Sequence, residues 1–387
     1  MICLCSLRFS LKALCLQLCL VVCHCVVSRK AVRSVLVMRH CVRSTPEEGI
    51  KAVPGFENFN SYSASQWPTF PVTSMSCLPR GLKLMEASGK WLRDRWLLPE
   101  PVHISSDDSQ RDKDTSRALL MGFAGTEQKE NFITDSASFD TLYSDACPEL
   151  TAAEEAEARR EQLAIWPVSS DLLQLQAKLF SALGTGVAGD WTAVPCHVSD
   201  TGQIVGSCQA AFEFTERLLM QAGGGLTMGW GNLSFEDVQA LLPLSTYYLR
   251  VSLAAPKLLK RKQPAIMRSV LSALEADDGT EIFMGHDTQL VALAAALDLS
   301  WDPHPYHSNA TLPGSALRFD RRGDDVEISY IYPDNFLDDH GAMGSVSAST
   351  SSISFSKLRR QLELGSDAAC TMSSEPRIPR REARFVF

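Results

Sequence analysis

Three short apolar runs of this chain each end in a cluster of charged and polar residues. The runs and their clusters are Ser34–Met38 before Arg39–Arg43, Val102–Ser106 before Asp107–Arg111, and Ile282–Met284 before Gly285–Thr288. Short apolar runs bounded by polar residues are typical of buried strands. In an open α/β sheet, the loops that follow parallel strands gather at one edge, where ligands bind. The sequence therefore predicts that three arginines, two histidines and a carboxylate meet at one edge of a sheet.

The pattern of helices and strands changes along the 387 residues, which are enough for two domains of ordinary size. Strands, loops and helices alternate in residues 31–125 and again in 276–387, whereas residues 126–275 are mainly helical. The predicted helices of that middle segment are Thr151–Leu163, Leu172–Leu183, Ala210–Ala222, Phe235–Leu242 and Tyr247–Leu274. We therefore expect an α/β fold, with an open and mainly parallel sheet flanked by helices and an inserted, mainly helical cap domain. Residues Ser345–Ser356 are low in complexity and are predicted to form a surface loop.

The overall charge argues for a small anionic ligand. The chain carries a net charge of -8 and has a pI near 5.6, which argues against a general nucleic-acid-binding surface. Arginines gathered at one place in an acidic protein therefore indicate a local anion-binding site, and we expect their partner to be a small phosphorylated substrate.

The cysteines and the N-terminal segment indicate an exported protein. Six of the twelve cysteines lie in the first 25 residues, beside an apolar stretch that follows Arg8 and Lys12, so residues 1–30 are predicted to be a secretory signal. A signal anchor, which alone would bring the protein to a membrane, and an incorrect start of the gene remain alternatives. We expect secretion or a location in an endomembrane or lysosome-like lumen, where the sequons at Asn232 and Asn309 could be glycosylated.

The remaining cysteines bear on metal binding and on disulfides. They are Cys41, Cys77, Cys147, Cys196, Cys208 and Cys370, and none has the CxxC spacing of a zinc site. Scattered cysteines in an exported chain suit disulfides. Cys196 and Cys208 are the preferred local pair, and two buried free thiols are the equal alternative.

The first two charged clusters offer groups that bind and attack a phosphate monoester. Planar guanidinium groups pair with phosphate oxygens in a bidentate manner, and Arg39, Arg43 and Arg111 supply such donors. A neutral imidazole between arginines can attack phosphorus, because the cations offset the negative charge of the ester. His40 is placed for this role and would become a phosphohistidine.

The third cluster offers a proton donor for the leaving alkoxide. Asp287 is the candidate, because a carboxylic acid beside bound phosphate is kept protonated by repulsion between like charges, which predicts activity at acid pH. Thr288 is predicted to cap the helix that begins there. Each of these residues taken alone also fits a purely structural role, but their joint position after three strands favours a site.

The motifs resemble those of the histidine acid phosphatases, within the branch of bacterial-type phytases and glucose-1-phosphatases. That family has an Arg-His-Gly-x-Arg-x-Pro motif and a distal His-Asp, and this chain has Arg39-His40-Cys41-Val42-Arg43-Ser44-Thr45-Pro46 and His286-Asp287. Further matching segments are Trp67–Val72, Leu78–Gly81, Gln110–Arg111 with Thr115, Gly229–Gly231 and Leu312–Gly314. The resemblance extends from about Val35 to Arg322, in the family's order.

The resemblance implies a phosphoglycerate-mutase-like α/β core with a helical second domain, acid phosphatase activity, and no metal or organic cofactor. It assigns His40 as the nucleophile and Asp287 as the proton donor, and it assigns Arg39, Arg43, Arg111 and His286 to the phosphate clamp. Substrates would be sugar phosphates or inositol phosphates.

The chain departs from the family's pattern in three places. Cys41 replaces the usual glycine, which could crowd the catalytic loop or merely fill space, and Pro46 stands one position late. A rival hypothesis is therefore that the protein is a catalytically impaired anion-binding or receptor-like relative of the family. A third hypothesis is that it is a phosphomutase. Glu47 and Glu48 stand where phytases carry a basic residue, so we expect singly phosphorylated sugars to be preferred over phytate.

Overall fold

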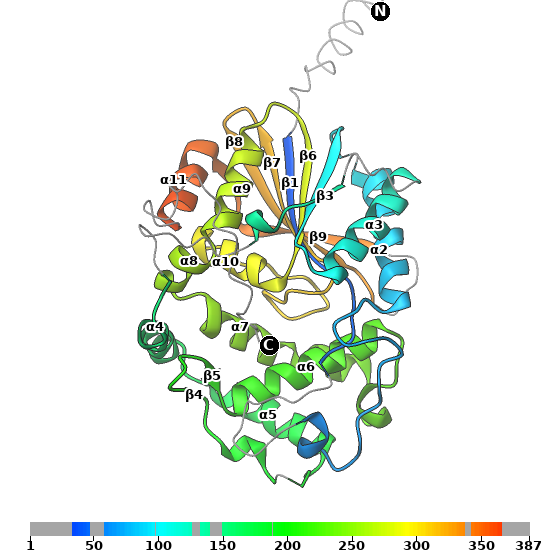
Figure 1. Ribbon diagram of the computed structural model, residues 1–387, viewed down its shortest axis with the longest axis vertical. Coiled ribbons are helices and arrows are strands. Elements are labelled where there is room, and N and C mark those ends of the chain that lie inside the picture. The colour runs from blue at the N-terminus through cyan, green and yellow to red at the C-terminus, as the bar shows by residue number, and fades with distance from the viewer. Residues whose placement is uncertain are drawn as a thin grey trace, which may run out of the picture.

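The computed structural model describes residues 33–46, 58–96, 98–125, 132–139, 149–187, 189–336 and 342–365. The predicted secretory signal, Glu47 with Glu48, Cys147 and Cys370 lie outside the described residues. The rest contains the sheet, its flanking helices and the helical middle segment (Figure 1).

Among the described residues, seven strands form one mixed sheet in the order β3-β2-β6-β1-β7-β8-β9 (Figure 1). The strands are β1 (Arg33–Arg39), β2 (Val102–Ser106), β3 (Phe132–Thr134), β6 (Gly279–Gly285), β7 (Ala316–Arg322), β8 (Asp325–Pro333) and β9 (Met343–Ser354). The first four in this order are parallel, whereas β7, β8 and β9 are joined to β1 and to one another by antiparallel pairing. The predicted α/β class with a parallel core is confirmed, and the antiparallel extension is an addition to it.

The alternation of side chains along β1 explains why helices cover both faces of the sheet. Val35 and Val37 belong to one buried cluster, and Leu36 and Met38 belong to another. Helices α2 (Pro79–Trp91) and α3 (Gln110–Ala124) pack on the Leu36 face, while α9 (Pro264–Glu275), α10 (Asp287–Leu297) and α11 (Phe355–Gly365) pack on the Val35 face (Figure 1). All seven residues of β1 are buried, as expected of a central strand covered on both sides.

The middle segment is helical, as the sequence predicted. Its helices are α4 (Ala152–Ile165), α5 (Ser170–Leu183), α6 (Ser207–Gly223), α7 (Phe235–Leu253), α8 (Pro256–Lys262) and α9, and it also contains strand β3 and a small hairpin of β4 (His197–Val198) and β5 (Ile204–Val205). The predicted helix Tyr247–Leu274 is instead three helices, because Pro256 and Pro264 each begin a new one.

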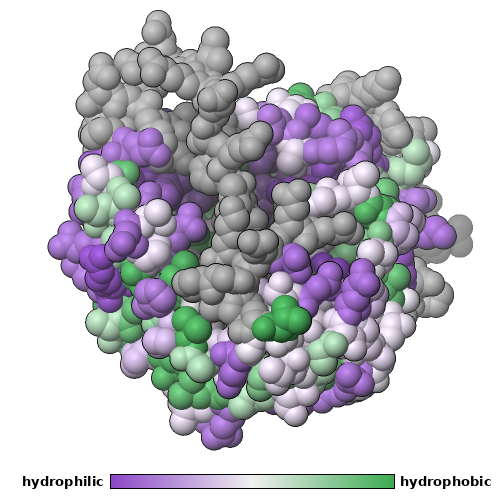
Figure 2. All heavy atoms as spheres, turned by 60° about the horizontal axis from the view of Figure 1, so that its bottom comes forward, coloured by the Kyte–Doolittle hydropathy of each residue, from purple (hydrophilic) through white to green (hydrophobic). Residues whose placement is uncertain are grey.

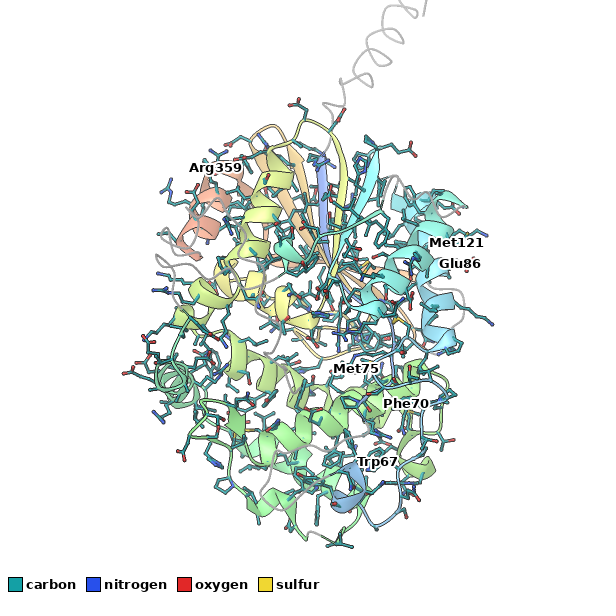
Figure 3. All side chains as sticks on the ribbon, in the orientation of Figure 1. Trp67, Phe70, Met75, Glu86, Met121 and Arg359 are labelled. Atoms are coloured by element: carbon teal, nitrogen blue, oxygen red, sulfur yellow. A yellow bond between two sulfur atoms is a disulfide. The ribbon has the colours of Figure 1, made fainter. Side chains whose placement is uncertain are left out.

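Residues from both parts of the chain fill one hydrophobic cluster. Phe59 and Trp67, which follow the first charged cluster in the sequence, pack against Phe214 of α6. Figure 3 shows Trp67 and Phe70 among the helices of the middle segment. Because the two parts share a core, the boundaries of a separate cap domain at 126–275 stay a prediction.

The prediction of a surface loop at Ser345–Ser356 is wrong. Most of this segment belongs to strand β9, which lies at the edge of the sheet and pairs with β8. Polar residues at alternate positions face solvent along an edge strand, so low hydrophobicity did not exclude a strand there.

The surface of the described part is mixed. Large exposed hydrophobic side chains are scattered over several elements and include Ile133, Ile165, Trp166, Leu173, Val187 and Leu364. The face in Figure 2 shows small hydrophobic groups between hydrophilic ones. No helix among the described residues has the length and apolar character needed to cross a membrane.

Candidate active site

The three charged clusters meet at one edge of the sheet, as predicted. Strands β1, β2 and β6 are parallel neighbours, and backbone hydrogen bonds continue past their ends. The His40 amide donates to the Gly285 carbonyl at 2.9 Å, and the Asp107 amide donates to the Met284 carbonyl at 3.1 Å. The sheet itself therefore sets the spacing of the loops that carry the candidate residues.

His40 is buried and holds its ring in one orientation. Its Nδ1 lies 2.9 Å from the Cys41 carbonyl, and because a carbonyl only accepts, Nδ1 carries the proton. Nε2 is then the atom with a free lone pair. Burial lowers the pKa of His40 well below its usual value, and the nearby charges of Arg111 and Arg43 lower it further. This shift favours the neutral form of the imidazole.

Three arginines lie near this ring, of which Arg39 is fully buried and Arg43 and Arg111 are partly buried. Within the described part of the chain, the Nε atoms of Arg39, Arg43 and Arg111 are all buried and have no hydrogen-bond partner. Burial lowers the pKa of Arg43 to about 10, with a further contribution from the charges of Arg111 and Arg39. Buried donors without acceptors cost free energy, so the cluster is suited to receive an anion.

His286 is held between an arginine and two carboxylates. Its Nε2 lies 2.9 Å from Asp107 Oδ2 and 3.7 Å from Asp112 Oδ2, and an Arg111 terminal nitrogen lies 3.3 Å from Nδ1. Burial raises the pKa of Asp107, but the hydrogen bond and charge of His286 outweigh it, so the net pKa is lowered. Burial raises the pKa of Asp112 to about 6. The ring centroids of His40 and His286 lie 5.4 Å apart.

Asp287 begins α10 and lies against Arg39, the residue before His40. Its Oδ2 is 3.0 Å from a terminal nitrogen of Arg39, and its side chain is 15% exposed. The predicted cap at Thr288 is wrong by two residues. The helix begins with His286 as its cap, and the Gln289 side chain accepts the His286 amide at 2.8 Å.

Two carboxylates from α6 lie near the arginines of the loop that carries His40, and they were not predicted. Glu216 Oε2 lies 2.5 Å from Arg39, and its Oε1 accepts the hydroxyl of Ser245. Glu213 lies one turn earlier on the same helix. Burial raises the pKa of Glu213 to about 7, because the opposing charge of Arg43 does not compensate and Glu216 and Asp287 add repulsion.

These glutamates gave only a weak signal in the sequence. They lie inside a helix whose sequence is amphipathic, and the arginines near them, Arg39 and Arg43, are about 170 to 180 residues away in the sequence. The signal that could have found them is their position among Phe212, Phe214 and Leu218, where a surface helix would place apolar residues.

The catalytic loop also contains a disulfide. Cys41 is bonded to Cys77, a pair that the sequence did not predict, whereas the predicted pair Cys196–Cys208 is confirmed. Nearby, Gly81 lets α2 approach the loop, because a Cβ there would lie 2.4 Å from the Val42 carbonyl oxygen.

A metal ion is poorly suited to this centre. His40, Asp112 and His286 offer ligand atoms within 4.8 Å of one another. The cations of Arg39 and Arg111 lie beside the same atoms, however, and would repel a second positive charge.

Comparison with solved structures identifies the fold. The chain superposes on the phytase of Citrobacter braakii with a TM-score of 0.74 at 21% identity, covering 89% of this chain and 100% of that one. For a Hafnia alvei phytase the TM-score is 0.74 at 21% identity, and the superposition covers 88% of this chain and 98% of that one. For a Klebsiella phytase the TM-score is 0.73 at 15% identity, and the superposition covers 91% of this chain and 100% of that one. No family model and no curated protein sequence matches the chain. The protein therefore has the fold of the bacterial phytases, an α/β histidine phosphatase fold.

Proposed function

We propose that this protein is a histidine acid phosphatase, which hydrolyses phosphate monoesters through a phosphohistidine at His40. The observation that carries the proposal is the buried His40 ring among three arginines whose Nε atoms are buried and lack acceptors. That arrangement combines a nucleophile with an anion receptor. The likeness to phytases supports the fold on which it is built.

In the first step, the phosphate of the ester binds to Arg39, Arg43 and Arg111. The Nε2 lone pair of His40 attacks phosphorus, and the bond from phosphorus to the leaving oxygen breaks with its electron pair. Asp287 gives its proton to that oxygen, so the product leaves as a neutral alcohol. The Cys41 carbonyl holds the Nδ1 proton and stabilises the charged ring of the phosphohistidine.

In the second step, water attacks the phosphohistidine. Asp287, now a carboxylate, accepts a proton from the water, and the bond from phosphorus to Nε2 returns its electron pair to His40. Phosphate leaves and the carboxylic acid is restored. Bound phosphate competes with Asp287 for Arg39 and repels its carboxylate, so the acid form is favoured when the ester is bound. This predicts activity in acid solution.

The physiological ester is a sugar phosphate or an inositol phosphate. The Hafnia alvei phytase, which shares the fold, has been solved with myo-inositol hexakis sulphate, so that protein accepts a highly charged ring. Two disulfides among the described residues support a secreted or lumenal location for this chain.

A chromogenic assay tests the proposal. We expect the protein to hydrolyse p-nitrophenyl phosphate at about pH 5, and His40→Ala to abolish this activity. Labelled phosphate trapped during turnover should be found on His40. A His40→Ala variant with full activity, or a label on another residue, would contradict the mechanism. A folded protein that binds phosphate without turnover would favour the receptor-like alternative.

A further inference from the structure

The disulfide beside the nucleophile joins two segments that carry phosphate-binding groups. Cys41 follows His40 directly, and Cys77 lies 36 residues later, just before α2. Their Cα atoms are 5.9 Å apart, and both side chains are buried, with exposures of 0% and 7%. The bond is therefore built into the wall of the site.

On one side, the bond fixes the loop that carries Arg43. Residues 42–44 run antiparallel to residues 76–78, with Arg43 opposite Cys77. Two backbone hydrogen bonds of 2.9 Å join the segments, and Met75 Sδ lies 3.3 Å from the Arg43 guanidinium. Figure 3 shows Met75 where the sheet part meets the helical part.

On the other side, the bond touches the first turn of α3, which carries Arg111. The Cys41 amide donates to the Thr115 hydroxyl at 3.0 Å, and that hydroxyl donates to the Arg111 carbonyl at 2.6 Å. Cys77 Sγ lies 3.4 Å from the same carbonyl oxygen and 3.5 Å from the hydroxyl oxygen. The two sulfurs thus lie between the backbones of both arginines.

We propose that the Cys41–Cys77 disulfide is a positioning element of the active site, which sets the spacing of His40, Arg43 and Arg111 and makes phosphate binding depend on the oxidised state. The inference rests on the proposed function, because it assigns phosphate to these groups. It also gives Cys41 a role at the position where the resembling family has glycine.

The physical reason is a change in the distance between two sulfur atoms. A dithiol reductant such as dithiothreitol adds two electrons and two protons, so two thiols form and the reductant becomes its cyclic disulfide. Bonded sulfurs are about 2 Å apart, whereas unbonded ones require more than about 3 Å. In a packed wall this moves the loops by about 1 Å, enough to cost up to about a hundredfold in rate.

The experiment compares the two disulfides of the described part. The test variant is Cys41→Ala with Cys77→Ala, and the matched control is Cys196→Ala with Cys208→Ala, whose disulfide joins the segment before β4 to the first turn of α6. For each protein we would measure the thermal midpoint, the kcat for p-nitrophenyl phosphate and the dissociation constant of inorganic phosphate by calorimetry. Both variants lose a cross-link, so both midpoints should fall.

Only the test variant should lose phosphate affinity and kcat, each by about tenfold or more, whereas the control should stay within about twofold of wild type. Reduction of the wild type should reproduce the loss as Cys41 and Cys77 become open to alkylation, and reoxidation should reverse it. The reductant experiment still tests the inference if the test variant does not fold. Unchanged phosphate affinity in protein whose Cys41 and Cys77 are reduced would overturn it.

The outcomes separate this inference from the proposed function. Oxidised protein that turns over through His40, while reduction changes neither constant, would overturn the inference alone. Oxidised protein with phosphate affinity but no turnover would overturn the proposed catalysis, while the affinity arm still decides the role of the disulfide. Oxidised protein with neither would overturn both.

Discussion

The sheet edge and helix α6 contribute different charges to the same site. The end of β1 and the start of α3 bring the arginines and His40, and the end of β6 brings His286 and Asp287, whereas α6 brings the carboxylates of Glu213 and Glu216. At the sheet edge, each group follows a strand, so its position is fixed by backbone pairing. On α6, each group depends on how a helix from a distant segment packs. We therefore expect the arginines at the sheet edge to bind the anion, and the carboxylates of α6 to neutralise part of the positive charge of those arginines.

The largest expected effect tests the acid at the sheet edge. Asp287→Asn cannot give a proton to a leaving alkoxide, so we expect kcat for an alkyl phosphate to fall by about a hundredfold to ten-thousandfold. Loss for p-nitrophenyl phosphate, whose leaving group is stable without a proton, should be much smaller. Steady-state kinetics with both esters measures the ratio. Equal losses would remove Asp287 from the role of proton donor.

The sequence could predict the sheet edge because local patterns encode it. A short apolar run followed by Arg39-His40 or His286-Asp287 predicts both the strand and the charged group at its end. The carboxylates of α6 and the Cys41–Cys77 bond depend on tertiary packing, and only a weak local pattern distinguishes Glu216 from a solvent-facing helical glutamate. The edge strand β9 was missed because its serines and threonines resemble a loop in composition, while its pairing with β8 is a long-range property.

The next effect tests the carboxylate that pairs with Arg39. Glu216→Gln leaves a buried arginine with one carboxylate in place of two, so the free energy of unfolding should fall by about 3 kcal/mol. The matched control is Glu327→Gln, whose exposed pair with Arg322 should contribute less than about 1 kcal/mol. Urea unfolding of both variants measures the difference.

Phosphate affinity gives the second readout for Glu216. The substitution removes a competitor for Arg39, so the folded variant should bind inorganic phosphate at least as tightly as wild type. Weaker binding would mean that Glu216 is needed to orient Arg39 rather than only to neutralise it.

The smallest effect tests Glu213 and depends on pH. With a pKa of about 7, this carboxyl group is neutral in acid and becomes a carboxylate near Arg43 above pH 7. Glu213→Gln should therefore bind sulfate, whose charge is constant over this range, as wild type does at about pH 5. At about pH 9 it should bind sulfate several-fold more tightly, because the variant lacks the repelling charge. Glu157→Gln, on the exposed face of α4, is the matched control.

The free energy of unfolding gives an independent check on Glu213 that needs no ligand. The pKa of Glu213 is raised by folding from 4.5 to about 7, so the unfolded chain releases this proton first and the wild type loses stability as pH rises through that interval. Glu213→Gln removes this loss, so the difference in unfolding free energy between variant and wild type should grow between about pH 4.5 and pH 7 and then stay constant. Urea unfolding at several pH values measures it. A constant difference across the interval would show that Glu213 is already ionised there in the folded protein, and α6 would then present its negative charge to the anion site throughout that pH range.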